Sequence, residues 1–170
     1  MKAALAFLAV ALASQADARA RELGIPFEGK PGPLNAITDI RGVEVGQKTL
    51  IEGNGVLRVG VGPVRTGVTV IFPLGKADPR PVYGGFFNLN GNGEMTGRAY
   101  LDDFGIVQGP IGITDTNGVG QVYAGIQQWH AKHFGSATWP VVASAAGCAS
   151  VRSSHHAAIS ASLGARAVSA

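Results

Sequence analysis

The residues most able to do chemistry lie in one stretch rich in glycine and asparagine, residues 88–97, with the sequence NLNGNGEMTG. It presents a single carboxylate, Glu94, after the strand-like run VYGGFF at residues 82–87. Glycine lets the backbone take positive φ and approach a ligand closely, and asparagine amides both donate and accept hydrogen bonds. We expect a polar pocket in which Glu94, shielded by Phe86 and Phe87, binds a cationic group such as a free amine. The alternative is an ordinary asparagine-glycine turn between two strands, with Glu94 solvated.

The histidines and the cysteine give weaker signals. His130 and His133 lie three residues apart, a spacing that can bind a metal, but no carboxylate or cysteine is close to them in sequence. We interpret them as a polar helix edge and predict neither a metal nor a cofactor. His155 and His156 are adjacent and would point apart on a helix or a strand. Cys148 is the only cysteine, so no disulfide or cysteine metal site can form within the chain.

The composition indicates one globular domain. Of the 170 residues, 46% are hydrophobic and 15% are charged, which is enough for one core and too short a chain for two domains. The 25 glycines favour many turns over a helical bundle. The net charge is +3, and no cluster of Lys and Arg is interleaved with aromatic residues, so we predict no nucleic-acid binding.

Residues 1–20 are predicted to be a secretory signal peptide. Lys2 precedes an unbroken apolar run at residues 3–13, and small residues at 16–20 form an A-x-A-like cleavage site. The apolar run is about half of the roughly 20 residues that span a bilayer. We therefore expect a periplasmic or secreted protein with no membrane association after cleavage.

Hydrophobic periodicity predicts the elements of the mature chain. After an arm rich in Gly and Pro at residues 21–33, strands are expected at residues 43–51, 66–72 and 82–87, paired antiparallel because the connections are short. Another strand is expected at residues 110–117.

Two helices are expected as well. A short one covers residues 98–105 and ends at Gly105. A long one starts at an N-cap formed by Thr116 or Asn117 and ends at Gly135. Its apolar stripe consists of Val119, Val122, Ile126 and Trp129.

Three motifs occur in order along the chain: NAITDIRGVEVG at residues 35–46, RTGVTVI at 65–71 and NGNGEMTG at 90–97. Together they resemble the amino-terminal part of the L-aminopeptidase/D-esterase family, the DmpA-like peptidases that include β-peptidyl aminopeptidases. The resemblance covers residues 21–143. It implies an α/β (α+β) fold: a partial α-β-β-α sandwich, mainly antiparallel, with one long helix, incomplete at the C-terminus.

The same resemblance implies an activity. The enzyme would be an exported serine-type aminopeptidase that cuts its own precursor, so that a serine becomes an N-terminal nucleophile with its own α-amine as general base. Its substrates would be short peptides, amides or esters with a free amine, and complete relatives would be homo-oligomers. Glu94 would bind the free amine. The other substrate-binding residues would be Asn90, Asn92, Tyr100, Phe86 and Phe87. Asp115 departs from the family pattern, which has an amide there.

Residues 144–170 also depart from the family pattern, which continues with an acidic and aromatic segment that holds an oxyanion asparagine. Here the chain is rich in Ala, Ser and Arg, without Asp or Glu. A frameshift or truncation near Ser144 would explain this bias, and the alternative is an alanine-rich helix at residues 157–167. No serine here has a self-cleavage context, so we expect no catalytic residue within this chain, which would be inactive alone.

Two other hypotheses come from different classes of protein. One is a binding protein of the same fold that has lost its nucleophile, and the other is a degenerate product without a stable fold. If the chain folds, the strands missing from the sandwich would leave sheet edges and apolar faces open, a predicted aggregation risk unless a partner chain completes it.

Overall fold

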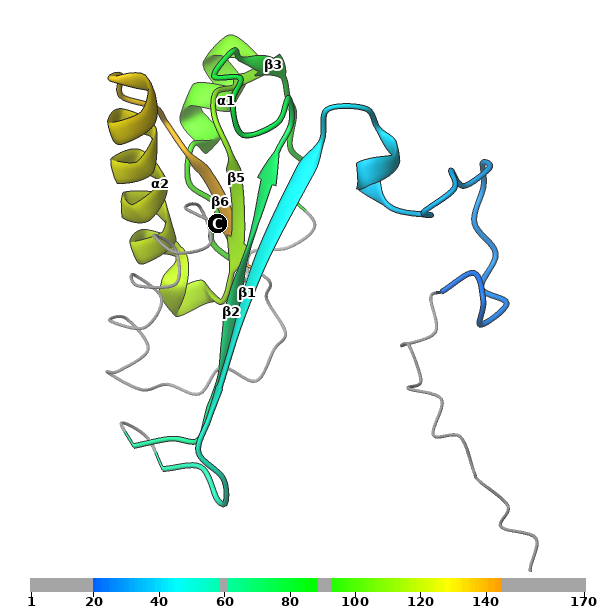
Figure 1. Cartoon of the computed structure of the whole chain (residues 1–170), viewed down its shortest axis with the longest axis vertical. Helices are drawn as coiled ribbons and strands as arrows, with labels where there is room; N and C mark the ends of the chain where they lie inside the picture. Colours follow the sequence, from blue (N-terminus) through cyan, green and yellow to red (C-terminus); the bar gives the residue numbers. More distant parts are fainter. Residues whose placement is uncertain (1–19, 59–60, 89–92, 145–170) are drawn as a thin grey trace, which may run out of the picture.

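The structure, a computed structural model, describes residues 20–58, 61–88 and 93–144. Its centre is a four-stranded sheet in the order β1-β2-β5-β6. The strands are β1 (Glu44–Glu52), β2 (Val64–Phe72), β5 (Ile111–Thr114) and β6 (Val141–Ser144). The β1–β2 and β2–β5 pairs are antiparallel, whereas β5 and β6 run parallel. Helix α2 (Val119–Phe134) lies along one face of the sheet (Figure 1). The predicted class, a mixed α/β fold with a mainly antiparallel sheet and one long helix, is confirmed.

The apolar stripe of α2 packs on the sheet as its periodicity predicted. Val122 and Ile126 are fully buried, and the ring of Trp129 meets Phe72 of β2 edge-on with 5.4 Å between ring centroids. Burying each such side chain stabilises the fold by about 1.5–3 kcal/mol. The complete cluster contains Val68, Val70, Phe72, Val119, Val122, Ile126, Trp129 and Val142.

At the helix ends, the predicted N-cap of α2 is wrong and the two predicted glycine C-caps are confirmed. Neither Thr116 nor Asn117 is the N-cap of α2: that position is Gly118, which makes no side-chain cap hydrogen bond, and Asp115 instead caps the turn before it, where its carboxylate accepts the backbone N–H of Asn117 at 2.9 Å. Asp115 can act as a cap because its backbone is extended, which is the geometry that a cap requires. Thr116 and Asn117 cannot, because they already belong to the 3-10 turn η2 (Thr116–Gly118) that leads into α2. Gly135 ends α2 and Gly105 ends α1 (Arg98–Phe104), both with positive φ as predicted.

The strand predicted at residues 82–87 is wrong in length and in partner. Strand β3 covers only Val82–Tyr83 and pairs with β4 (Ile106–Val107) in a separate two-stranded ribbon. At Gly84 a Cβ would stand 2.5 Å from Val107 Cγ2, so the side chain of Val107 occupies the space that a larger residue would need at the end of β3. The ribbon and α1 bury Leu101, Val107 and Val141 in a second cluster. Strand β6 was not predicted, since four residues are too few to show a period.

One side of the sheet is open among the described residues, as predicted. Val45 on the outer strand β1 is 41% exposed, and no strand of the described part pairs with the outer edge of β1. The arm before it contains only η1 (Ile37–Asp39) and extends away from the sheet (Figure 1). No helix in the described ranges is long and apolar enough to cross a membrane.

The two ends of the sequence carry predictions that the structure does not address. Nearly all of the predicted signal peptide lies outside the described residues, as do the Ala/Ser/Arg-rich tail after Ser144, Cys148, His155 and His156. Those predictions stand as made.

Gly112 tests the close approach of α2 to the sheet. A Cβ at this position would stand 2.8 Å from Val122 Cγ1 and 3.3 Å from Val142 Cγ2. Overpacking of this kind costs about 1–3 kcal/mol, so G112A should lower the urea midpoint of unfolding. The matched control is Gly120 on the exposed side of α2, where a Cβ meets nothing within 4 Å and G120A should stabilise by about 0.5–1 kcal/mol. Equal midpoints for the two variants would contradict the packing.

Candidate functional site

Strands β5 and β6 end together at one edge of the sheet, where polar side chains collect. Thr114 and Ser144, the last residues of the two strands, are register partners. Thr114 Oγ1 donates to the Gly67 carbonyl at 2.9 Å, and Thr66 Oγ1 donates to the Asp115 carboxylate at 3.2 Å. The carboxyl ends of parallel strands are common places for ligands in α/β proteins. This polar edge is the candidate site.

Glu94 reaches the polar edge because its backbone pairs with β6. The Ser144 N–H donates to the Glu94 carbonyl at 2.8 Å, and the Glu94 N–H donates to Ser144 Oγ at 2.8 Å. Met95 then forms an antiparallel bridge with Ala143. The Glu94 side chain is exposed. The Glu94 carboxylate therefore faces solvent, while the backbone N–H and carbonyl of the same residue are both hydrogen-bonded to Ser144.

Thr96 fastens the other end of this short pairing. Its N–H donates to the Val142 carbonyl at 3.0 Å, and its Oγ1 accepts the Val142 N–H at 2.9 Å while donating to the Pro140 carbonyl at 2.8 Å. Residues 94–96 thus extend the sheet by one edge segment beyond β6.

The expected shielding of Glu94 by Phe86 and Phe87 is not found among the described residues. Phe87 is 88% exposed. Phe86 packs against the second cluster, and the Arg98 guanidinium covers its ring at 4.7 Å from the centroid. This face of the Phe86 ring is therefore already occupied by a cation of the protein itself, the Arg98 side chain.

Tyr100 lies away from Glu94, at the other end of β6. Its ring stacks on Trp139 with a centroid distance of 5.1 Å and an interplanar angle of 3°, and it lies 4.7 Å from Phe104. Trp139 precedes Ser144, the partner of Glu94, by five positions, which is roughly 15 Å along an extended chain. The structure therefore does not bring Tyr100 beside the carboxylate.

The sequence missed three residues of the polar edge: Thr66, Thr96 and Ser144. Their hydrogen bonds join residues 44 to 50 positions apart in the chain, so no local pattern could have revealed them. Asn90 and Asn92 lie outside the described residues. Their binding roles, like those of the other substrate-binding residues, stay predictions.

The two helix histidines occupy different environments. His130 is fully buried, with Nδ1 2.9 Å from the Ser136 carbonyl oxygen, so its interpretation as part of a polar helix edge is wrong. It is buried because the last turns of α2 lie under the loop at residues 73–81, which the helical period alone does not show. His133 is exposed and stacks on Trp129 with centroids 4.6 Å apart. Within the described ranges, no group of three His, Cys, Asp or Glu side chains could hold a metal ion.

Comparison with known proteins assigns the chain to a family. The model of peptidase family S58 matches residues 35–164, which is most of the chain and includes residues beyond Ser144. The chain belongs to peptidase family S58. Its curated relatives include the β-peptidyl aminopeptidases BapA of Sphingosinicella xenopeptidilytica, 52% identical over 119 residues, and of Sphingosinicella microcystinivorans, 50% identical over 133 residues. These alignments cover 70% and 77% of this chain but 30% and 34% of the relatives, so the chain spans about a third of their length.

Solved structures show the same fold. The L-aminopeptidase D-Ala-esterase/amidase of Ochrobactrum anthropi, described as a variant of the Ntn hydrolase fold, matches with a TM-score of 0.64 and 42% identity. That match covers 75% of this chain and 37% of the other. A β-aminopeptidase of Burkholderia sp. matches with a TM-score of 0.72 and 38% identity, over 89% of this chain and 43% of the other.

Thr96 tests the anchoring of the Glu94 segment. The T96V variant removes the acceptor of the Val142 N–H, and Val142 is fully buried, so the loss should cost about 1–3 kcal/mol. Amide hydrogen exchange should speed up at Val142 and Glu94. T96S keeps the hydroxyl and is the control, with exchange close to that of the unaltered chain. Unchanged protection at Val142 in T96V would show that the anchoring is absent.

Proposed function

We propose that the whole protein is an exported serine-type aminopeptidase that removes N-terminal residues from short peptides, amides or esters. Membership of peptidase family S58 supports this proposal, as do relatives named as β-peptidyl aminopeptidases and a solved structure named as an L-aminopeptidase D-Ala-esterase/amidase. The chain spans about a third of those relatives. The activity is therefore proposed for the complete polypeptide, and the described residues supply its recognition of the substrate.

The observation that carries the proposal is the placement of Glu94. Its backbone is held to β6 by two hydrogen bonds of 2.8 Å while its carboxylate faces solvent at the polar edge. A carboxylate is an acceptor that pairs strongly with a protonated amine, and a fixed backbone lowers the entropy lost when the pair forms. An aminopeptidase needs such a group because it must select substrates with a free N-terminus.

The nucleophile is proposed to be a serine made N-terminal by self-cleavage, supplied by polypeptide outside the described residues. Ser144 does not suit the role, since its Oγ already accepts the Glu94 N–H and supports the recognition loop. An N-terminal serine needs no separate histidine, because its own α-amine takes the proton from its hydroxyl.

Binding measurements on the 170-residue chain test the role of Glu94. An amino acid amide with a free amine should bind, and E94Q should weaken its binding roughly tenfold or more, since a hydrogen bond to a charged group contributes about 1.5–3 kcal/mol. The N-acetylated amide should bind weakly to both proteins. Titration by NMR gives each Kd.

The matched control for this titration is D103N, which removes another exposed carboxylate, on α1, and should leave the Kd unchanged. Equal affinity of the unaltered chain for free and N-acetylated amides would refute amine recognition by Glu94.

A second measurement tests whether the 170-residue chain has catalytic activity by itself. The purified 170-residue chain should not hydrolyse β-alanyl or aminoacyl amides above the uncatalysed rate, because no described residue is a self-cleaved N-terminal serine. A complete member of the family, assayed beside it, serves as the positive control. Turnover by the chain alone would show that it contains its own nucleophile.

A further inference from the structure

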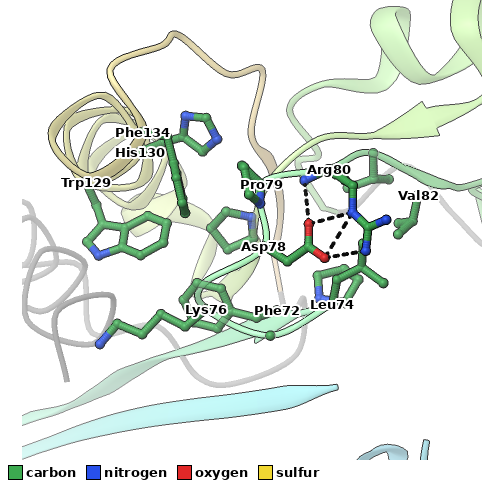
Figure 2. A pocket seen from close by; sticks show the side chains of 15 residues that line it. Phe72, Leu74, Lys76, Asp78, Pro79, Arg80, Val82, Trp129, His130 and Phe134 are labelled. Atoms are coloured by element: carbon green, nitrogen blue, oxygen red, sulfur yellow. Dashed lines mark hydrogen bonds and ion pairs between the residues drawn. The ribbon is translucent and has the colours of Figure 1, made fainter. Parts of the chain in front are cut away.

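A narrow cavity lies at the opposite end of β5 from the polar edge. It is enclosed by the last turns of α2, the loop at residues 73–81 and the backbone that enters β5 (Figure 2). Phe72, Pro79, Trp129 and Phe134 form much of its wall. The volume open to a water-sized sphere is about 10 Å³, roughly the space for one water molecule.

The loop over the cavity is held by an ion pair. Arg80 Nη2 lies 2.6 Å from Asp78 Oδ2, and Arg80 Nε donates to Oδ1 at 2.9 Å, as Figure 2 shows. The side-chain hydrogen bonds from Arg80 hold the pKa of the Asp78 carboxyl below its ordinary value. The pair joins positions 78 and 80 of the loop over the cavity, so it stiffens that loop. The interior of the cavity is lined by the residues beneath it.

His130 contributes an unsatisfied polar atom to this cavity. The ring is 0% exposed, and Nδ1 is 2.9 Å from the Ser136 carbonyl oxygen. A carbonyl only accepts, so Nδ1 carries the proton and Nε2 of the neutral ring is an acceptor. Among the described residues Nε2 has no hydrogen-bond partner. Leaving such a buried acceptor unpaired costs about 1–3 kcal/mol.

A second buried acceptor lies near the same spot. Gly109 has no side chain, and a Cβ built there would stand 3.9 Å from His130 Nε2 and 3.2 Å from Thr138 Oγ1. Thr138 is 1% exposed, and its hydroxyl hydrogen is used in a bond of 2.7 Å to the Gln108 carbonyl. Its oxygen therefore keeps lone pairs that can accept. The side-chain-free side of Gly109 thus lies between two buried acceptors.

We propose that this cavity binds one long-lived water molecule, which donates a hydrogen bond to His130 Nε2. The ligand must be able to donate, because Nε2 of His130 accepts, and an anion would set its charge against that lone pair. It must be a single heavy atom, because the cavity has no room for more.

NMR on the full chain tests both parts of the proposal. Long-range ¹H–¹⁵N correlation of the imidazoles at neutral pH should show His130 with its proton on Nδ1 and Nε2 unprotonated. A rotating-frame Overhauser contact should link water to the Gly109 amide. A proton on Nε2 would overturn the proposal, and so would the absence of a water contact at Gly109.

Counting long-lived waters gives an independent test. Oxygen-17 relaxation dispersion should report one fewer such water in H130F than in the unaltered chain, and no change in H133F, which removes the exposed histidine of the same helix. An unchanged count in a folded H130F would overturn the proposal. If H130F does not fold, the measurements on the unaltered chain decide the question, since they need no variant.

Discussion

The fold depends on the close approach of helix α2 to the sheet at Gly112. The missing side chain at this position lets Val122 and Ile126 of the helix reach the backbone of β5, and Val142 of β6 closes the same contact. This contact packs β5 and β6 under one helix, and the parallel pairing of the two strands places their last residues, Thr114 and Ser144, opposite each other. The polar edge exists because these two strands stop together.

That edge in turn places the one carboxylate on which the proposed function rests. Residues 94–96 belong to no named strand and take their position from β6 by hydrogen bonds to Ser144 and Val142, with Met95 bridged to Ala143 between them. A loop rich in glycine would otherwise hold a side chain loosely. Pairing its end with a strand converts a flexible segment into a rigid support, which is what selective recognition of an amine requires.

The open side of the sheet fits the membership of a family in which the chain spans about a third of the length of its curated relatives. Helix α2 packs on one face of the sheet at β2, β5 and β6, while no residue of β1 is buried and Val45, on the opposite face, remains exposed. A half-covered sheet of this kind needs an apolar partner to reach ordinary stability. In the proposed function, the Glu94 segment depends on polypeptide beyond the described ranges for the nucleophile.

The sequence alone determined the long helix, its apolar stripe, its glycine stop, the first two strands and the family. Each depends on a period, a cap or a motif that lies within a few neighbouring residues. The tertiary structure decided that β3 pairs with β4, that Glu94 and Tyr100 lie at opposite ends of β6, and that His130 is buried. These features come from contacts between residues far apart in the chain, such as Glu94 and Ser144, which are 50 positions apart. A contact of that kind leaves no period in the sequence, because it depends on how the packed elements bring the two residues together.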